Sequence, residues 1–147
     1  MAEVRRADAV WQGELTTGSG QVSASSSHAF SDLPVSWASR TSAAQGKTSP
    51  EELVAAAHAS CFSMALSAGL GRAGHPPERL QVSAEVTFGQ VDGGWAVVSS
   101  ALTVRGKVPG MDAAAFTQAA EAAKDGCPIS KALKNNVELS VTATLDA

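Results

Sequence analysis

The sequence predicts a single α+β domain of mostly antiparallel strands and a few helices, and three observations lead to this class. Residues 80–88 and 137–145 alternate apolar and polar side chains, which is the period of a half-buried strand. A helical pattern of about 20 residues follows Ser49, and a second helical stretch follows Asp112. The 147 residues suit one domain, 1–147, and no internal repeat or linker divides them.

The first third of the chain is typical of short strands joined by turns. Residues 9–15 alternate in polarity, and the Thr-Thr-Gly-Ser-Gly run at 16–20 indicates a turn. Residues 21–24 and 33–40 are further strand candidates. Residues 41–48, which include a glycine, are expected to form a loop.

The longest predicted element is a helix that begins at Ser49. Ser49 is the expected N-cap, Pro50 occupies the first helical position, and Glu52 lies where it would complete a capping box. The helix should end between Gly69 and Gly74. Its side chains are apolar on more than one side, so we expect a central, buried helix.

The second half of the chain continues with a hairpin, two helices and a strand. Residues 80–88 pair with residues 95–104 across a turn at 91–94. A helix follows with Asp112 as N-cap, and a short helix begins at Cys127-Pro128. With the closing strand, the predicted order is βββ–α–ββ–αα–β.

Composition excludes several functional classes. The formal net charge is −3 and the 11 Lys and Arg residues are scattered, so no basic surface for nucleic acid is expected. The N-terminus lacks the apolar segment of a signal peptide, and no uninterrupted apolar run approaches membrane-span length. We therefore expect a soluble, cytoplasmic protein. In that reducing compartment, a disulfide between the 2 cysteines would be transient and catalytic.

The two cysteines occupy different helical positions. Cys61 lies in the middle of the long helix, where a lone thiol is more often an inert small hydrophobe. Cys127, between Gly126 and Pro128, is expected at a helix N-terminus, where the helix dipole favours the thiolate. A disulfide needs Cα atoms about 5.5–6 Å apart, and only the fold decides that distance. Together the two positions favour a redox pair.

A thiol in the middle of a helix needs a nearby cation to become a nucleophile. Arg40, at the end of the predicted strand 33–40, is the best candidate, although a solvated charge is its ordinary interpretation. His58, three residues before Cys61, is the rival, but a packed helix histidine is the simpler interpretation. A metal site formed by His58 and Cys61 is weaker, because no second pair of ligands has zinc-site spacing.

Glu51 supplies a carboxylate that could pair with Arg40. Glu51 and Cys61 are 10 residues apart, which is about 15 Å along a helix. A glutamate side chain does not reach that far along its own helix. If Glu51 serves a cysteine, we therefore expect it to be Cys61 of a second subunit whose long helix packs antiparallel.

The chain closely resembles the OsmC hydroperoxide reductases of the OsmC/Ohr superfamily over nearly its whole length. The residues that carry this resemblance are Trp11-Gln-Gly13, Thr48-Ser-Pro-Glu-Glu-Leu-Val54, Ala57-His-Ala-Ser-Cys-Phe-Ser-Met-Ala-Leu66, Val108-Pro-Gly-Met-Asp112 and Ala123-Lys-Asp-Gly-Cys-Pro-Ile-Ser130. A helical Cys followed by a distant Gly-Cys-Pro is the most specific of these features. Residues 16–21 contain no Arg, which favours the OsmC branch over the organic hydroperoxide resistance branch.

The resemblance implies an OsmC-like fold: an antiparallel sheet with a long central helix, in an intertwined homodimer with two sites at the interface. It implies that Cys61 is the peroxidatic cysteine and Cys127 the resolving one, with Arg40 and Glu51 as the polar pair that activates Cys61. His58 has no catalytic role in the family. The expected reductant is a dihydrolipoyl group or a small thiol, and no cofactor or metal is needed.

The expected reaction reduces organic hydroperoxides to alcohols through a Cys61 sulfenic acid and a Cys61–Cys127 disulfide, as an antioxidant function under oxidative or osmotic stress. Phe62, Met64 and Phe30 are expected to line an apolar approach for the peroxide. Two alternatives remain. One is a cysteine hydrolase that uses Cys61 and His58, and the other is a non-catalytic stress protein that binds a small ligand.

Overall fold

Six strands and four helices follow one another in the order βββ–αα–ββ–αα–β. The computed structural model describes residues 1–147, and the chain divides into two units, Met1–Leu53 and Val54–Ala147. The α+β class and the predicted order are confirmed, apart from one additional short helix before the long one.

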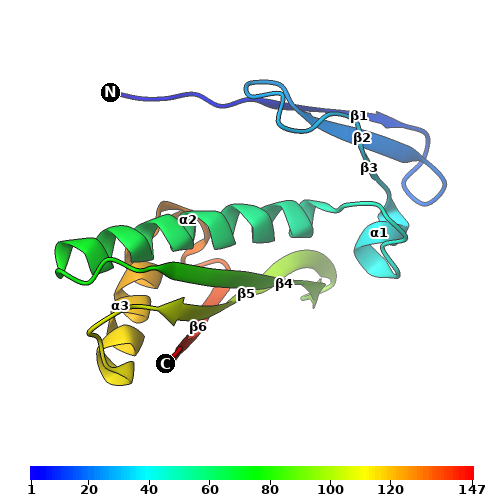
Figure 1. Ribbon diagram of the computed structural model, residues 1–147. Helices are drawn as coiled ribbons and strands as arrows, with labels where there is room; N and C mark the ends of the chain where they lie inside the picture. Colours follow the sequence, from blue (N-terminus) through cyan, green and yellow to red (C-terminus); the bar gives the residue numbers. More distant parts are fainter. The chain divides into compact units, whose positions relative to one another are not determined.

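The first unit contains a small antiparallel sheet with strand order β1-β2-β3 (Figure 1). Its strands are β1 (Ala7–Gln12), β2 (Ser19–Ala24) and β3 (Leu33–Val35). Every residue of β1 is exposed, and the buried positions of the unit are Gly20 and Glu51. A sheet with so little buried apolar surface gains little hydrophobic stabilisation by itself.

The strand predicted over residues 33–40 is wrong beyond Val35. Residues Trp37–Thr41 form a short helix, α1, so Arg40 lies in the last turn of a helix. Ser36 caps α1: its hydroxyl accepts the Ser39 N–H at 3.1 Å, and the Ser39 hydroxyl accepts the Ser36 N–H. The apolar residues 35 and 37 fitted a strand, but this serine pair stabilises a helix start instead.

The long helix, α2 (Pro50–Arg72), has the predicted bounds. The Ser49 hydroxyl accepts the Glu52 N–H at 3.1 Å, which confirms Ser49 as the N-cap. The Glu52 carboxylate accepts a hydrogen bond from the Thr48 hydroxyl at 2.7 Å rather than closing the expected box with Ser49. The acidic first turn of α2 complements the positive end of the helix dipole.

The second unit contains a sheet with strand order β4-β5-β6, built from β4 (Arg79–Val91), β5 (Gly94–Lys107) and β6 (Glu138–Leu145). Strands β4 and β5 form the predicted hairpin, and their turn at Asp92 and Gly93 has positive φ at both residues. Strand β6 pairs with β5 in parallel, so the sheet is mixed rather than purely antiparallel. Helices α3 (Ala113–Gly126) and α4 (Pro128–Leu133) connect β5 to β6.

The core of the second unit lies between one face of this sheet and the helices (Figure 1). Alternate residues of β5, including Leu102 and Val104, are buried against Phe62 and Leu66 of α2. The core also contains residues of α3 and of the segment before it: Val108, Phe116, Ala120 and Ala123. The opposite face of the sheet is mostly polar and exposed, as one-sided burial requires.

Gly106 of β5 allows α3 to approach the sheet closely. A Cβ atom at this position would lie 2.4 Å from Cζ and 2.7 Å from Cε2 of Phe116. The Phe116 ring is completely buried, so it has little freedom to move away. A glycine is therefore required for the ring to fill this part of the core.

Only one side of α2 is buried within its own chain, which differs from the fully buried helix that we expected. His58, Phe62, Leu66 and Leu70 face the core, whereas the opposite side is exposed, with Met64 69% exposed. The remaining exposed positions are mostly small: Ala56, Ser60, Ser67, Ala68 and Gly71.

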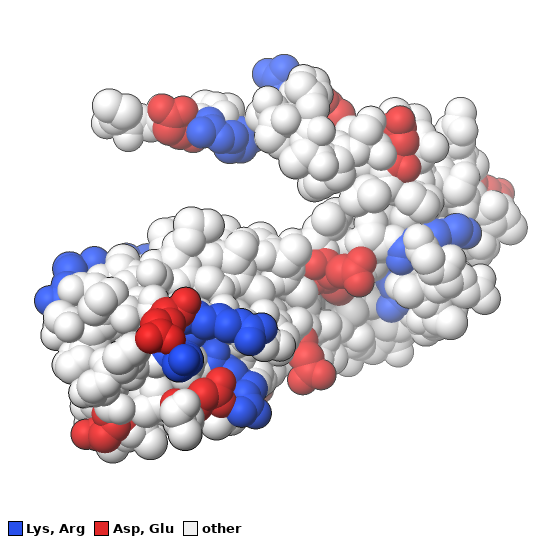
Figure 2. Space-filling model, in the orientation of Figure 1, with Lys and Arg blue, Asp and Glu red and all other residues white.

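By length and composition alone, α2 could also cross a membrane, because it has 23 residues and a mean hydropathy of 1.5 in its most apolar window. The core helix of a soluble protein meets the same criteria. Since α2 contributes Phe62, Leu66 and Leu70 to the core, its hydropathy is explained by packing. On the face drawn in Figure 2, Lys and Arg are interspersed with Asp and Glu and form no continuous basic stripe.

Candidate active site

The fold brings the two cysteines together, although 66 positions separate them in the sequence (127 − 61). Cys61 lies in α2, and Cys127 is both the C-cap of α3 and the N-cap of α4. The two thiols lie near enough to shift each other's pKa, and both are free rather than joined by a disulfide. Cys61 is half-buried, whereas Cys127 is completely buried, so a small molecule from solvent meets Cys61 first.

The surroundings of the two sulfurs shift their pKa values in opposite directions. Burial raises the pKa of the Cys61 thiol and the neighbouring Cys127 raises it further, against a hydrogen bond from the Ile129 N–H. Burial also acts to raise the pKa of Cys127, but hydrogen bonds from the Ser130 N–H, the Cys61 thiol and the Ser130 hydroxyl outweigh it, and the pKa is lowered. Within these surroundings, Cys127 therefore ionises before Cys61.

The predicted polar pair, Arg40 and Glu51, is formed within the first unit. The Arg40 Nη2–H donates to Glu51 Oε1 at 2.6 Å, and Nε–H lies 3.2 Å from both carboxylate oxygens. The Arg40 guanidinium also lies over the Trp37 ring, 5.7 Å from its centroid. Glu51 is 8% exposed and Arg40 is 28% exposed, so the carboxylate fixes a cation that solvent and ligands still reach.

An apolar pocket lies beside Arg40 in the same unit. It has a volume of about 300 Å³ and is lined by Trp11, Leu15, Val35, Ser36, Trp37, Arg40 and Pro50. Two tryptophans and a guanidinium in one pocket suit a molecule with an apolar body and a polar end. The apolar approach expected at Phe62 is wrong, because Phe62 is completely buried in the core of the second unit.

His58 is buried, and serines occupy both of its ring nitrogens. Nδ1 lies 2.7 Å from Ser100 Oγ of β5, and Nε2 lies 2.8 Å from Ser130 Oγ of α4. Burial lowers the pKa of His58 and so favours the neutral ring. Because neither nitrogen is directed at Cys61, the arrangement does not suit a Cys61–His58 hydrolase and agrees with a packed histidine.

Comparison with known proteins agrees with these features. The model of the OsmC family, described as OsmC-like protein, matches residues 43–142. The chain belongs to the OsmC family. It is 41% identical to Peroxiredoxin OsmC of Escherichia coli (strain K12) over 135 residues, which cover 92% of this chain and 93% of that protein.

Two further similar proteins carry the name organic hydroperoxide resistance protein. The Organic hydroperoxide resistance protein of Xanthomonas axonopodis pv. citri is 33% identical over 96 residues, which cover 65% of this chain and 66% of that protein. The crystal structure of OhrB of Bacillus subtilis shares the fold, with a TM-score of 0.74 and 24% identity, and covers 95% of this chain and 98% of that chain. These comparisons confirm the predicted OsmC-like fold.

The contacts of Ser100 and Ser130 with His58 were not predicted from the sequence of this OsmC-family chain. Ser100 lies 42 positions and Ser130 lies 72 positions from His58, and no local pattern links either serine to the histidine. A weak signal existed for Ser130, because it is the third residue after the N-cap Cys127. A polar side chain three residues after an N-cap lies near the N-cap side chain, which here is the Cys127 thiol.

Proposed function

We propose that the protein is a thiol-dependent peroxidase that reduces organic hydroperoxides to alcohols, with Cys61 as the peroxidatic cysteine and Cys127 as the resolving one. The observation that carries this proposal is the contact between a half-buried thiol and a completely buried thiol in one chain. Peroxide from solvent reaches Cys61 more easily, and Cys127 already lies beside the sulfur that it must attack. The 41% identity to Peroxiredoxin OsmC supports the same chemistry.

The reaction has three steps. The Cys61 thiolate attacks one peroxide oxygen, an S–O bond forms as the O–O bond breaks, and the alkoxide takes a proton and leaves as an alcohol. The Cys127 thiolate then attacks the Cys61 sulfenic acid, an S–S bond forms, and hydroxide leaves as water with the proton that Cys127 released. An external dithiol, or two molecules of a small thiol, reduces this disulfide by exchange and is oxidised to a disulfide. The reductant is a dihydrolipoyl group or a small thiol, and the reaction takes place in the cytoplasm.

Arg40 and Glu51 of one subunit act on Cys61 of another. The surroundings within the second unit raise the pKa of Cys61, so this thiol needs a cation from elsewhere to become the first thiolate. Glu51 lies 10 residues, or about 15 Å, before Cys61 on α2, beyond the reach of its side chain. Glu51 holds Arg40 in an ion pair, so in the proposed dimer both residues lie beside Cys61 of the partner subunit.

A homodimer also accounts for the apolar surface that a single chain leaves open. One side of α2 is exposed although it consists of small residues and Met64, and the first unit buries almost none of its residues. Small side chains permit two helices to approach closely. We therefore propose that two copies pack through α2 and that the pocket beside Arg40 holds the alkyl group of the peroxide.

A mass measurement tests the peroxidase proposal. Reduced protein is mixed with a stoichiometric alkyl hydroperoxide and should lose two hydrogens, with a Cys61–Cys127 link in the peptide map. Cys61→Ser should consume no peroxide, whereas Cys127→Ser should complete one turnover and stop at sulfenic acid. An acyl-enzyme formed from an ester would support a hydrolase instead. Thiols that remain reduced would support a protein that only binds a ligand.

Mixed dimers test whether the site is shared between subunits. Cys61→Ser chains and Glu51→Ala chains are each impaired, but a dimer of one of each should contain one intact site. We expect activity in the mixture to rise clearly above that of either variant alone. Mixing Cys61→Ser with Cys127→Ser chains is the matched control if the disulfide forms within one chain, because no complete site then results. Equal activity in both mixtures would contradict a shared site.

A further inference from the structure

The buried histidine of α2 is hydrogen-bonded to two serines, and one of them lies in the helical turn that begins at the resolving cysteine. Ser100 Oγ lies 2.7 Å from His58 Nδ1, and His58 Nε2 lies 2.8 Å from Ser130 Oγ. Ser130 follows the N-cap Cys127 by three residues in α4, and its hydroxyl is among the groups that lower the pKa of Cys127. All four side chains are at most 2% exposed, so no bulk water competes for these bonds.

The ionised sulfur of Cys127 determines which group donates and which accepts in each of these hydrogen bonds. A thiolate accepts hydrogen bonds only, so the Ser130 hydroxyl must donate to Cys127 in its ionised form. The Ser130 oxygen then accepts the proton on His58 Nε2, which leaves Nδ1 to accept the Ser100 hydroxyl. A neutral histidine satisfies this pattern completely, and burial keeps His58 neutral by lowering its pKa.

We propose that His58, which is held by Ser100, is a positioning residue for the resolution step: it orients the Ser130 hydroxyl to stabilise the Cys127 thiolate that attacks the Cys61 sulfenic acid. This inference rests on the peroxidase function proposed above. In that step the S–S bond forms, the S–O bond breaks, and hydroxide leaves as water with the proton released by Cys127. His58 neither touches the peroxide nor exchanges a proton with it.

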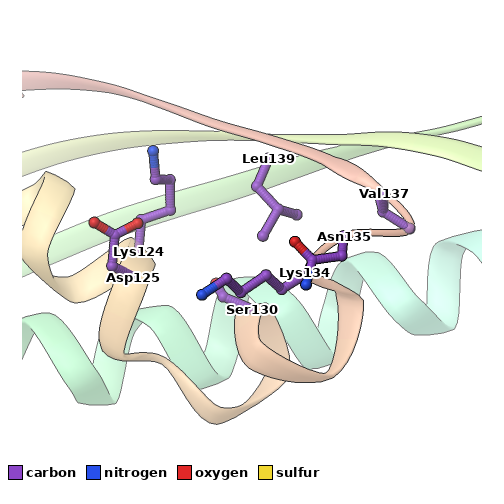
Figure 3. Close-up of a pocket in the computed structure, with 7 residues that line it drawn as sticks. All are labelled: Lys124, Asp125, Ser130, Lys134, Asn135, Val137 and Leu139. Atoms are coloured by element: carbon purple, nitrogen blue, oxygen red, sulfur yellow. The ribbon is translucent and has the colours of Figure 1, made fainter.

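The charged groups around Ser130 are few and identifiable. Ser130 lines a cavity of about 260 Å³ together with Lys124, Asp125, Lys134, Asn135, Val137 and Leu139 (Figure 3). Glu121 raises the pKa of Lys124 by a hydrogen bond, so this lysine stays protonated near neutral pH. Lys124, Asp125 and Lys134 are the titratable residues that line this cavity beside Ser130, and His58 contacts Ser130 from α2. Lys124→Gln therefore serves to separate the effect of a nearby charge from that of the hydrogen bonds.

The test measures two steps separately. Sulfenic acid formation is followed by the loss of free Cys61 thiol, and disulfide formation by mass and by trapping of the remaining sulfenic acid. Ser130→Ala removes the donor to a charged sulfur, so we expect disulfide formation to slow about tenfold or more at neutral pH while sulfenic acid formation is unchanged. His58→Leu should do the same. His58→Gln, whose amide can still donate to Ser130, should recover most of the rate.

Ser100→Ala is the matched control. Like Ser130→Ala, it removes a serine hydroxyl and one hydrogen bond to His58, but His58 Nε2–H can still donate to Ser130. We expect a smaller loss in this variant than in Ser130→Ala. In a Cys61→Ser background, ultraviolet titration of the Cys127 thiolate should give a higher pKa for Ser130→Ala and His58→Leu than for His58→Gln.

The outcomes separate this inference from the proposed function. Normal disulfide formation in Ser130→Ala, or equal losses in Ser100→Ala and Ser130→Ala, would overturn the role of His58 while leaving the peroxidase intact. If the wild-type protein forms no disulfide at all, the peroxidase proposal fails instead. Should His58→Leu not fold, the comparison between Ser130→Ala and Ser100→Ala decides alone, since both remove a single oxygen atom.

Discussion

The two units of the chain differ in what their folding buries. Every apolar core residue belongs to Val54–Ala147, whereas Met1–Leu53 buries only Gly20 and the ion-paired Glu51. Hydrophobic burial supplies most of the favourable free energy of folding, so the second unit has its own source of stability and the first has little. The thiols lie in the stable unit, and the cation lies in the unit that needs another surface to cover it.

This difference links activity to assembly. Cys61 and Cys127 meet without help from another chain, but the surroundings within their unit favour the thiolate at Cys127 rather than at Cys61. The proposed dimer would cover the exposed first unit. It would also bring Arg40 of the partner subunit to Cys61, whose pKa is otherwise raised. A monomer would then hold a disulfide-forming pair without a reactive first thiol.

The largest expected effect follows from removing the cation of the first unit. Arg40→Ala should lower the rate of Cys61 oxidation by about 100-fold or more, because the thiolate loses its counter-charge. Arg40→Lys should recover only part of this rate, since a lysine keeps the charge but does not reproduce the forked contact with Glu51. Stopped-flow measurement of Cys61 thiol loss against an alkyl hydroperoxide gives both rates.

Arg105→Ala is the matched control for Arg40. Arg105 also pairs with a carboxylate, that of Asp146, but on the exposed surface of the second unit. We expect its replacement to leave the oxidation rate within about twofold of the wild type, because exposed ion pairs contribute little. A similar loss in both arginine variants would mean that general electrostatics, and not the placement of Arg40, controls Cys61.

The contrast between the units also separates what the sequence could predict from what it could not. Local patterns were sufficient for the capped helix α2, the β4–β5 hairpin and the turn between helices at Cys127, because each is decided by neighbouring residues. The residues themselves suggested Arg40 and Glu51, and the family resemblance implied the same pair. The structure pairs them, although their action on Cys61 stays a prediction.

The misses have physical reasons. The end of the strand predicted at residues 33–40 was wrong because a Ser36–Ser39 capping pair lacks the usual glutamate, so the helix start looked like a continuing strand. The contacts of His58 with Ser100 and Ser130 could not be predicted, since they join α2, β5 and α4 and arise only when the core forms. Non-local hydrogen bonds leave no period in a sequence.

The cores of the two units are compared by the free energy of unfolding. Phe116→Ala in the second unit should cost about 3–5 kcal/mol, because a completely buried ring leaves a cavity. Val10→Ala in β1 should cost less than about 0.5 kcal/mol in a dilute monomer, where Val10 is 63% exposed. Urea unfolding followed by circular dichroism gives both values.

Protein concentration sharpens this comparison. If a second copy covers β1, the cost of Val10→Ala should rise as the protein is concentrated and the dimer forms, whereas the difference between Phe116→Ala and the wild type should stay large throughout. A cost for Val10→Ala that is equally small at every concentration would show that the first unit stays uncovered in solution. The proposed dimer would then need a different interface.

The smallest expected effect is a pH dependence that arises in the second unit. Burial lowers the pKa of His58 below the ordinary value of 6.5, so the unfolded chain binds a proton at a pH at which the native chain does not. Stability from the neutral ring is therefore complete above about pH 6.5 and falls by up to about 1.4 kcal/mol per pH unit below it, until the native pKa is reached. His58→Gln should flatten this part of the stability curve, as measured by urea unfolding between mildly alkaline and mildly acidic buffers.

His28→Asn, which removes an exposed imidazole from a left-handed turn in the first unit, should retain the wild-type slope. If His58→Gln kept that slope as well, the acid sensitivity would have to arise from other groups, and His58 would not be held neutral by its two serines.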